Sequence, residues 1–372
     1  MGGGLTLAVC IAILFYTLAV SANFYDDTII QQVTEEEGQG INGENLLMRT
    51  HERKFQMFIK QYGKEYSSKE EYVHRLGIFA KNVLRAAEHQ ALDPTAIHGV
   101  TPFSDLSEEE FESRFFGLKR VGSLGANEIG DEETAPILDV DDLPTNFDWR
   151  EKGAVTPVKM QGICGACWAF TTTGAIEGAN FLATGKLVSL SEQQLVDCDH
   201  TCDLKEKDSC DSGCDGGLMT NAYKYLMEAG GLQDEKSYPY EGKKRVCRFK
   251  PEQIAAKVIN FTNIPLDEDQ IAANLVRHGP LAVGINAVFM QTYIGGVSCP
   301  LICSKKRLNH GVLLVGYRDK GFSILRLGNR PYWIIKNSWG KHWGDHGYYK
   351  LCKGEAMCGM NTMVSAVATV TT

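Results

Sequence analysis

The segment Gln161-Gly162-Ile163-Cys164-Gly165-Ala166-Cys167-Trp168-Ala169-Phe170 decides how the rest of this 372-residue chain is interpreted. Cys167 begins an apolar run that continues to about Leu182 and stops before Gly185, which predicts a helix. Partial positive charge collects at the amino terminus of a helix and favours the thiolate form of a cysteine placed there. Taken alone, Cys164 and Cys167 also fit a thioredoxin-type redox pair or half of a zinc site.

Two motifs much later in the chain supply the groups that a reactive thiol needs. Asn309-His310-Gly311 opens one apolar stretch, and Lys336-Asn337-Ser338-Trp339-Gly340 follows a second. An imidazole beside a thiol takes its proton and later gives it to a leaving amine. A side-chain amide beside the imidazole holds the ring in one tautomer, which is the role of the third group in a catalytic triad.

These motifs together resemble the papain-like (cathepsin) cysteine proteases, in which Cys-Gly-[Ser/Ala]-Cys-[Trp/Tyr] precedes a distant histidine and asparagine. The resemblance covers residues 143–372 and continues through Phe147-Asp148-Trp149-Arg150, Ser189-Leu190-Ser191-Glu192-Gln193 and Gly213-Cys214-Asp215-Gly216-Gly217. It implies an α+β, papain-like two-lobe fold, with a helical lobe and a β-barrel-like lobe, preceded by a helical inhibitory propeptide. It also implies a cysteine endopeptidase that uses no metal and no other cofactor.

The resemblance gives each catalytic residue a role. Cys167 would be the nucleophile, His310 its base and later the general acid, and Asn337 the residue that orients the imidazole. Gln161 matches the side-chain donor that stabilises the oxyanion, together with the backbone N–H of Cys167. Trp339 matches the tryptophan that shields the Asn–His hydrogen bond from water, and it is counted with the substrate-binding residues.

The resemblance also implies how a peptide substrate binds. The backbone of Gly216 and Gly217 would pair with the substrate main chain. The pocket for the substrate's P2 side chain would be wholly uncharged, lined by Leu218, Met219, Gly284, Leu308 and Met363. A buried Arg or Lys would find no partner there, so we expect Leu, Val or Phe at P2.

The cysteine count agrees with one reactive thiol. Of 12 cysteines, Cys10 lies in the leader, and the odd remainder implies one free thiol in an oxidising compartment. The resemblance implies the pairs Cys164–Cys214, Cys198–Cys247 and Cys303–Cys358, to which Cys202–Cys210 and Cys299–Cys352 are added. Two alternatives stay open: Cys299 and Cys303 could exchange partners, and Cys198, Cys202, Cys210 and Cys214 could form a structural zinc site.

The first residues predict a secretory protein. Residues 5–20 are almost wholly apolar, and Val20-Ser21-Ala22 supplies small residues for cleavage, so residues 1–22 are a predicted signal peptide. Gly2 also fits the loose myristoylation pattern. The vacuole or lysosome is the expected destination, with the extracellular space as the alternative, and no membrane anchor is expected. With 38 basic and 46 acidic residues, the net charge of −8 argues against nucleic acid as a partner.

Composition divides the remainder into a propeptide, residues 23–134, and a mature domain, residues 135–372. Apolar residues recur at helical spacing from Leu46 to Leu92, where Asp93-Pro94 ends the helix, and strand-like segments appear after Pro280. The acidic, glycine-rich stretch from Gly122 to Leu143 predicts an exposed linker. We expect acid to loosen carboxylate contacts such as those of Asp105, so that the enzyme cuts itself near Ala135–Leu143.

The pro-region resembles one branch of the family. Six residues fall along one side of a helix and match the variant of cathepsin F and its plant relatives: Glu71, Arg75, Phe79, Asn82, Ala86 and Gln90. Glu71 and Arg75 could alternatively be only a surface pair. With the second motif, Gly99-Val100-Thr101-Pro102-Phe103-Ser104-Asp105, this indicates the drought-responsive vacuolar proteases of plants.

The expected partners are protein and peptide substrates, the chain's own propeptide as an intramolecular inhibitor, and cystatin-type inhibitors, with the chain itself a monomer. Asn260 begins an Asn-x-Thr sequon and is a predicted glycosylation site. His346 stands where asparagine or glycine is more usual. Two other functions remain open: a catalytically silent homologue, and a disulfide oxidoreductase that uses Cys164 and Cys167.

Overall fold

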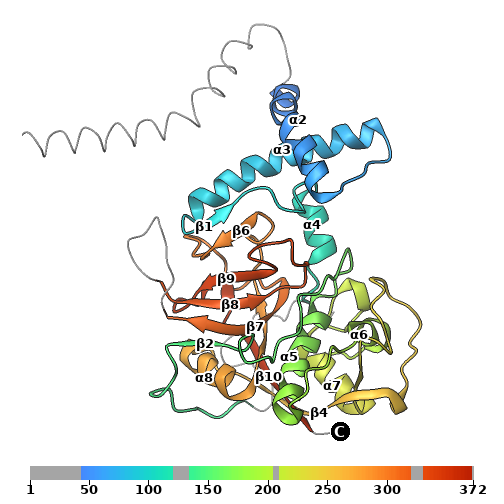
Figure 1. The fold of residues 1–372 in the computed structure, drawn as a ribbon, viewed down its shortest axis with the longest axis vertical. Coiled ribbons are helices and arrows are strands. Elements are labelled where there is room, and N and C mark those ends of the chain that lie inside the picture. The colour runs from blue at the N-terminus through green and yellow to red at the C-terminus, as the bar shows by residue number, and fades with distance from the viewer. Residues whose placement is uncertain (1–42, 120–133, 204–208, 320–329, 371–372) are drawn as a thin grey trace, which may run out of the picture. The chain divides into compact units, whose positions relative to one another are not determined.

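The computed structural model describes residues 43–119, 134–203, 209–319 and 330–370 (Figure 1). The predicted signal peptide and residues 120–133 of the linker lie outside them. The chain divides into two units, up to Ala80 and from Lys81, and each is described by itself. Within the described residues, no helix has both the length and the hydropathy that crossing a lipid bilayer requires.

The first unit is held together by aromatic side chains. It contains α2 (Gly43–Tyr62) and the first half of α3 (Lys69–Leu92). The rings of Phe55 and Phe58 lie 5.2 and 5.1 Å from that of Phe79, and all three side chains are buried. Helical spacing of apolar residues therefore marks the face along which the two helices pack.

The second half of α3 begins the second unit. The amide of Asn82 donates to the carbonyls of Ser104 and Leu106, at 2.8 and 2.7 Å. Gln90 donates to Ala96 O and accepts from His98 N, so it holds strand β1 (Ala96–His98) beside the helix. The three later members of the six-residue motif thus organise the chain after α3, since Ala86 is also buried.

The pro-region joins the mature domain through backbone pairing. Strand β1 pairs antiparallel with β6 (Tyr293–Gly296). Helix α4 (Glu108–Phe115) follows, and Ser107 and Glu110 form a capping box that satisfies its first N–H groups. This pairing and helix lead the chain toward Cys167.

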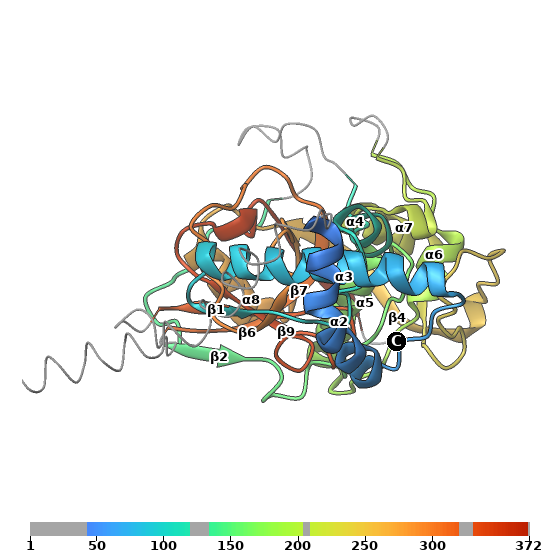
Figure 2. The same ribbon diagram turned by 90° about the horizontal axis from the view of Figure 1, so that it is seen from above.

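The helical lobe consists of α5 (Cys167–Thr184), α6 (Glu192–Cys198) and α7 (Met219–Ala229). Helix α5 ends at Thr184, two residues beyond the predicted end, and is capped by Gly185, whose φ of 72° suits glycine. All residues from Cys167 to Asn180 are buried, because α5 lies between the other helices and the sheet. Figure 2 shows α6 and α7 on one side and β6, β7 and β9 on the other.

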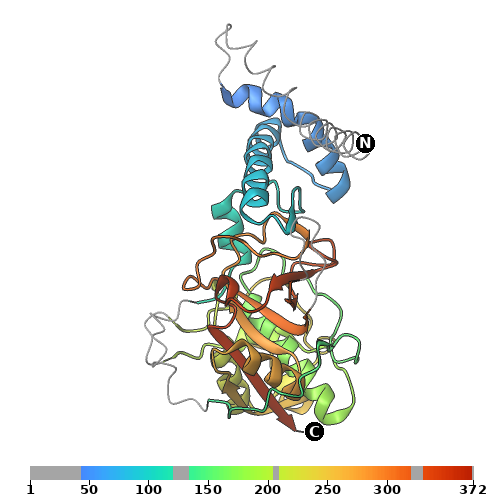
Figure 3. The same cartoon turned by 90° about the vertical axis from the view of Figure 1, so that its left-hand side faces the viewer.

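The second lobe is an antiparallel sheet with the strand order β3-β4-β10-β5-β7-β8-β9, and β2 pairs with β7. Its strands are β2 (Asn146–Asp148), β3 (Leu232–Gln233), β4 (Ile254–Asn263), β5 (Leu281–Ile285), β7 (His310–Arg318), β8 (Tyr332–Lys336), β9 (Tyr348–Cys352) and β10 (Met363–Val370). Helix α8 (Glu268–His278) contacts β7 and β10, and β10 runs alongside α5 (Figure 3). The predicted α+β fold class is confirmed.

Five disulfides join the cysteine-rich domain: Cys164–Cys214, Cys198–Cys247, Cys202–Cys210, Cys299–Cys352 and Cys303–Cys358. These are the pairs expected from the sequence. They contradict a zinc site at the four candidate cysteines and an exchange of Cys299 with Cys303. Because Cys164 is bonded to Cys214, Cys167 is the one free cysteine in the described part of the chain, and a Cys164–Cys167 redox pair is excluded.

Candidate active site

Cys167 is the first residue of α5, and its side chain is 0% exposed. Its sulfur accepts the backbone N–H of Gly311 at 3.4 Å and that of Gly117 at 3.2 Å. Gly311 lies at the start of β7, and a Cβ there would be 3.1 Å from Thr171 Oγ1. Glycine at this position therefore lets α5 and β7 pack closely. This brings Cys167 beside Gly311, the residue that follows His310.

His310 and Asn337 meet because β7 begins with one and β8 ends just before the other. His310 Nε2 lies 2.8 Å from Asn337 Oδ1, which also accepts the N–H of Ser338. Since Oδ1 is an acceptor, we assign the imidazole proton to Nε2. His310 Nδ1 is then an unprotonated base, and it makes no hydrogen bond to any residue that the structure describes.

Gln161 is fixed from both sides. Its Nε2 donates to Phe115 O at 3.1 Å and to Cys164 O at 2.9 Å. Its Oε1 accepts the hydroxyl of Ser338 at 2.6 Å, and its backbone N–H donates to Ser338 O. Sequence reasoning missed Ser338 as a positioning residue, although its place directly after Asn337 was a signal.

The ionisation of Cys167 differs from the thiolate that its place at the amino terminus of a helix predicts. Burial raises the pKa of Cys167 to about 11, and burial lowers that of His310 to about 4 despite its bond to Asn337. Both groups are therefore neutral at pH 7. The physical reason is the pro-region, which covers the pair and removes the water that would stabilise an ion pair.

The segment after α4 crosses the site. Gly217 N donates to Gly117 O at 2.9 Å, and Lys119 N donates to Gly217 O at 3.1 Å. A Cβ on Gly117 would lie 1.8 Å from the carbonyl oxygen of Gly165. Only glycine can therefore occupy this position of the pro-region. Gly216, with a φ of 103°, likewise leaves room for Gly117 O.

The five residues predicted to line the P2 pocket lie in or against one apolar cluster that includes a pro-region leucine. Leu118 is 8% exposed and belongs to the same apolar cluster as Leu218 and Met219, against which Leu308 and Met363 pack. A Cβ on Gly284 would lie 2.9 Å from Leu118 Cδ2. The role of these residues as a P2 pocket stays a prediction.

Trp339 is buried by aromatic rings of the pro-region. It stacks on His310 with ring centroids 4.6 Å apart. Four phenylalanine rings of the pro-region also lie near the Trp339 ring, with centroid distances of 5.7, 5.1, 6.1 and 6.3 Å: Phe103, Phe111, Phe115 and Phe116. The sequence did not identify this cluster, because its members come from two segments whose approach depends on the fold.

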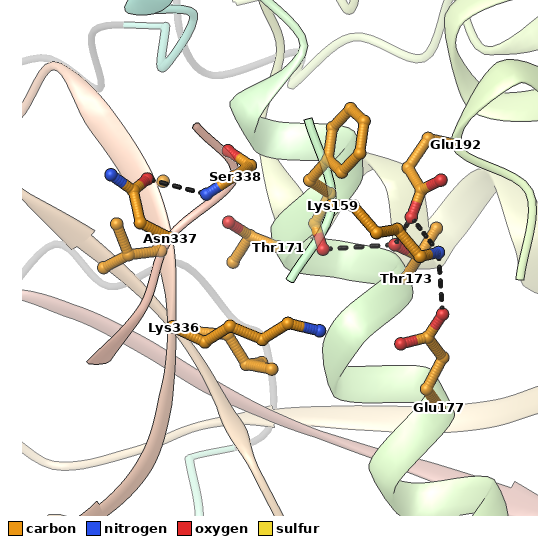
Figure 4. Close-up of a pocket in the computed structure, with 12 residues that line it drawn as sticks. Lys159, Thr171, Thr173, Glu177, Glu192, Lys336, Asn337 and Ser338 are labelled. Carbon is orange, nitrogen blue, oxygen red and sulfur yellow. Dashed lines mark hydrogen bonds and ion pairs between the residues drawn. The ribbon is translucent and has the colours of Figure 1, made fainter. Parts of the chain in front are cut away.

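An ionic network with buried carboxylates lies across from Asn337 and Ser338, on the side of the helix that carries Thr173 and Glu177 (Figure 4). Lys159 Nζ contacts Glu177 Oε1 at 2.9 Å and Glu192 Oε1 at 2.6 Å, while Lys336 donates to Thr156. Burial opposes the charge of Lys159, but the two carboxylates hold its pKa above the usual value. The network joins α5 to β8 and so links the element that carries Cys167 to the one that precedes Asn337.

Asn260 lies within β4 with an exposed side chain, and its Oδ1 accepts the N–H of Phe261. Its glycosylation stays a prediction. Across the described residues, no group of three or more His, Cys, Asp or Glu side chains is placed to hold a metal ion.

Residues 143–368 match the sequence profile described as "Papain family cysteine protease", and residues 55–111 match "Cathepsin propeptide inhibitor domain (I29)". The chain is 66% identical to "Probable cysteine protease RD19D" of Arabidopsis thaliana, over 98% of this chain and 97% of the relative. It is 55% identical to "Cysteine proteinase 15A" of Pisum sativum, over 95% and 96%. Among solved structures, digestive procathepsin L 3 of Tenebrio molitor is similar, with a TM-score of 0.72 and 35% identity over 85% of this chain and 98% of that one.

Proposed function

The chain belongs to the papain family of cysteine proteases, and from this we propose that it is the zymogen of an endopeptidase that acts through Cys167, His310 and Asn337. It carries a cathepsin propeptide inhibitor domain at residues 55–111. The observation that carries the proposal is the free thiol of Cys167 at the start of α5, with pro-region Gly117 on its sulfur. The free thiol and the His310–Asn337 hydrogen bond argue against a catalytically silent homologue.

The reaction begins once the cleft is open. His310 Nδ1 takes the proton of Cys167, and the sulfur attacks the carbonyl carbon of the substrate peptide bond. Gln161 Nε2 and the N–H of Cys167 stabilise the charge that develops on the carbonyl oxygen. His310 protonates the leaving amine as the C–N bond breaks and a thioester remains. Water, deprotonated by His310, hydrolyses the thioester and restores the thiol.

The pro-region contacts the same catalytic groups as a substrate would, but in a different arrangement. Gln161 Nε2 binds the carbonyl of Phe115, whereas the sulfur of Cys167 contacts the N–H of Gly117. The sulfur thus meets a backbone N–H, whereas the oxyanion donor meets the carbonyl of a residue two positions earlier. This supports a segment that inhibits the enzyme and is not hydrolysed while it is docked.

We also propose a preference for Leu, Val or Phe at P2; the burial of pro-region Leu118 in the apolar cluster of Leu218 and Met219 and beside Gly284 supports it. A charged P2 side chain would be buried without a partner. A peptide library with a varied P2 residue and a constant P1 tests this on the matured enzyme. We expect these apolar residues to give the highest kcat/KM, and basic P2 residues as the best substrates would overturn the proposal.

Maturation is proposed to be triggered by acid and to occur amino-terminal to Ala135. Ala135 is buried, and its N–H donates to Asn263 O at 2.9 Å. The amide of Gln270 binds Leu138 N and O, so residues 135–138 already lie on the mature domain. Because residues 135–138 are bound in this way, we expect their peptide bonds to be cleaved poorly. The expected cleavage site therefore lies before Ala135.

Residues 1–22 are proposed to direct the chain into the secretory pathway, with the vacuole or lysosome as its destination and the extracellular space as the alternative. Five disulfides fit an oxidising compartment. A monomer and inhibition by cystatin-type proteins remain predictions. A fall in mass after glycosidase treatment, absent in Asn260→Gln, would support glycosylation at Asn260.

Labelling with a thiol-directed epoxysuccinyl inhibitor tests the function directly. We expect the acid-matured protein to take up one adduct, mapped by mass to Cys167, and to lose its activity on a protein substrate. Cys167→Ala should fold, because no disulfide uses this thiol, and should neither label nor hydrolyse. Activity of Cys167→Ala within tenfold of the unaltered enzyme would overturn the assignment.

A further inference from the structure

Two buried carboxyl groups lie close to residues 216–218, the backbone segment whose Gly217 pairs with Leu118 of the pro-region. Asp199 is 0% exposed and ends α6, and Asp211 is 2% exposed and follows Cys210. Thr201 joins them, because its N–H donates to Asp199 Oδ1 at 2.9 Å and its carbonyl accepts the N–H of Asp211 at 2.9 Å. The catalytic scheme uses neither carboxyl group.

Asp211 touches the substrate-binding backbone directly. Its Oδ1 accepts the N–H of Leu218 at 2.8 Å and the amide of Asn221 at 3.2 Å. A Cβ on Gly217 would lie 2.7 Å from the same oxygen. On its other side, Gly217 exchanges backbone hydrogen bonds with the pro-region at Gly117 and Lys119. Asp211 therefore holds in place the backbone segment whose Gly217 pairs with the pro-region.

The remaining oxygens of the two carboxyl groups depend on each other. Oδ2 of Asp199 and Oδ2 of Asp211 receive no hydrogen bond from any described donor. Burial raises the pKa of both carboxyl groups, and each group shifts the pKa of the other. One proton shared between the two carboxyl groups would satisfy both of these oxygens. The other titratable neighbours of Asp199 are His200 and Tyr225.

We propose that the Asp199–Asp211 carboxyl pair positions the backbone of residues 216–218 and thereby sets the affinity for extended peptide substrates. The inference rests on the proposed endopeptidase function and adds a positioning residue, Asp211, to it. Asp199 orients Asp211, whose Oδ1 accepts the N–H of Leu218. This contact keeps the backbone of Gly217 where it can form hydrogen bonds with the main chain of a substrate. Main-chain pairing at Gly217 lies away from the scissile bond and is needed equally in the ground state and the transition state, so the pair should affect binding more than the chemical step.

Two substitutions at Asp211 in the matured enzyme separate hydrogen bonding from charge. In Asp211→Asn, the amide oxygen still accepts from Leu218 and the amide N–H donates to Asp199, so we expect KM and kcat near those of the unaltered enzyme. Asp211→Leu has similar bulk but cannot accept, and losing a buried hydrogen bond should raise KM about tenfold with kcat little changed. The substrate is a peptide that reaches the P3 residue.

Alkylation by iodoacetamide provides the control, because this small reagent reaches Cys167 without contacting residues 216–218. Its rate should be equal in all variants. If Asp211→Leu fails to fold, Asp211→Ser, whose hydroxyl is too short to reach Leu218, takes its place with the same expected rise in KM. An unchanged KM in the non-accepting variant, or an equal rise in Asp211→Asn, would overturn the inference. An inactive unaltered enzyme would instead refute the proposed function.

Discussion

Single atoms decide whether the pro-region can lie on the nucleophile. At Gly117, an added methyl group would lie 1.8 Å from the carbonyl oxygen of Gly165, well inside any van der Waals contact. His346 shows the opposite case, because its φ of 53° is left-handed, which explains why asparagine or glycine is more usual there. Local backbone geometry thus explains why Gly117 must be glycine and why histidine is unusual at position 346.

Gly117→Ala should weaken inhibition by the pro-region. Overpacking at this contact should cost about 1–3 kcal/mol of docking free energy, so the zymogen should hydrolyse a small peptide at neutral pH well above the level of the unaltered zymogen. Gly77→Ala is the matched control, because its added Cβ meets only Met48 at an ordinary 3.6 Å. Equal latency of Gly117→Ala and the control would contradict the prediction.

The thiol of Cys167 should be unreactive until the pro-region leaves. With a pKa of about 11 in the zymogen, only about one thiol in 10⁴ is ionised at pH 7. Iodoacetamide should therefore alkylate the zymogen slowly, with a rate that climbs toward pH 11, and should alkylate the mature enzyme rapidly even in mild acid. Rapid labelling of the zymogen at pH 6 would show that the thiol is already activated.

At the scale of elements, α3 and β1 attach the pro-region to the mature domain through buried histidines. His89 Nδ1 lies 2.8 Å from Thr292 Oγ1, and its ring is 4.7 Å from that of Phe289. His98 bonds to the same hydroxyl and to Asp93, whose carboxylate accepts the N–H of Cys299. Burial at this contact disfavours the charged form of the His89 imidazole.

His89 should make docking sensitive to acid. Burial, with Arg85 and His98 nearby, lowers its pKa from 6.5 to about 3. A depressed histidine pKa stabilises docking fully above pH 6.5, and the stabilisation is lost progressively as the pH falls from 6.5 toward 3. His89→Gln keeps a partner for Thr292 without the titration, so its maturation rate should rise less steeply with acid. His74→Gln, exposed on the same helix, should match the unaltered zymogen; equal steepness in His89→Gln would refute the role.

At the scale of the whole chain, maturation should depend on the enzyme's own thiol and on pH. Incubation of the purified zymogen across a pH series, followed by mass, should show loss of the pro-region in acid and none in Cys167→Ala. The mature amino terminus should fall at or before Ala135, because residues 135–138 are bound to the mature domain. Processing of Cys167→Ala, or an amino terminus within 139–143, would contradict the prediction.

The sequence by itself determined the family and the α+β class, because these depend on residue types at spacings that little else reproduces. The resemblance implied the disulfide pairs, and the structure decided between them and the two alternatives that the sequence left open. Helix α5 was predictable from an apolar run that ends at Gly185, and the positions of Cys167, His310 and Asn337 followed from their motifs. Only the tertiary structure decided the ionisation of the thiol, since burial under Phe116 and Gly117 reverses the effect expected of a helix amino terminus. It alone also brought Asp199 and Asp211 together, because both are bound to the backbone of Thr201 and no local pattern reveals this arrangement.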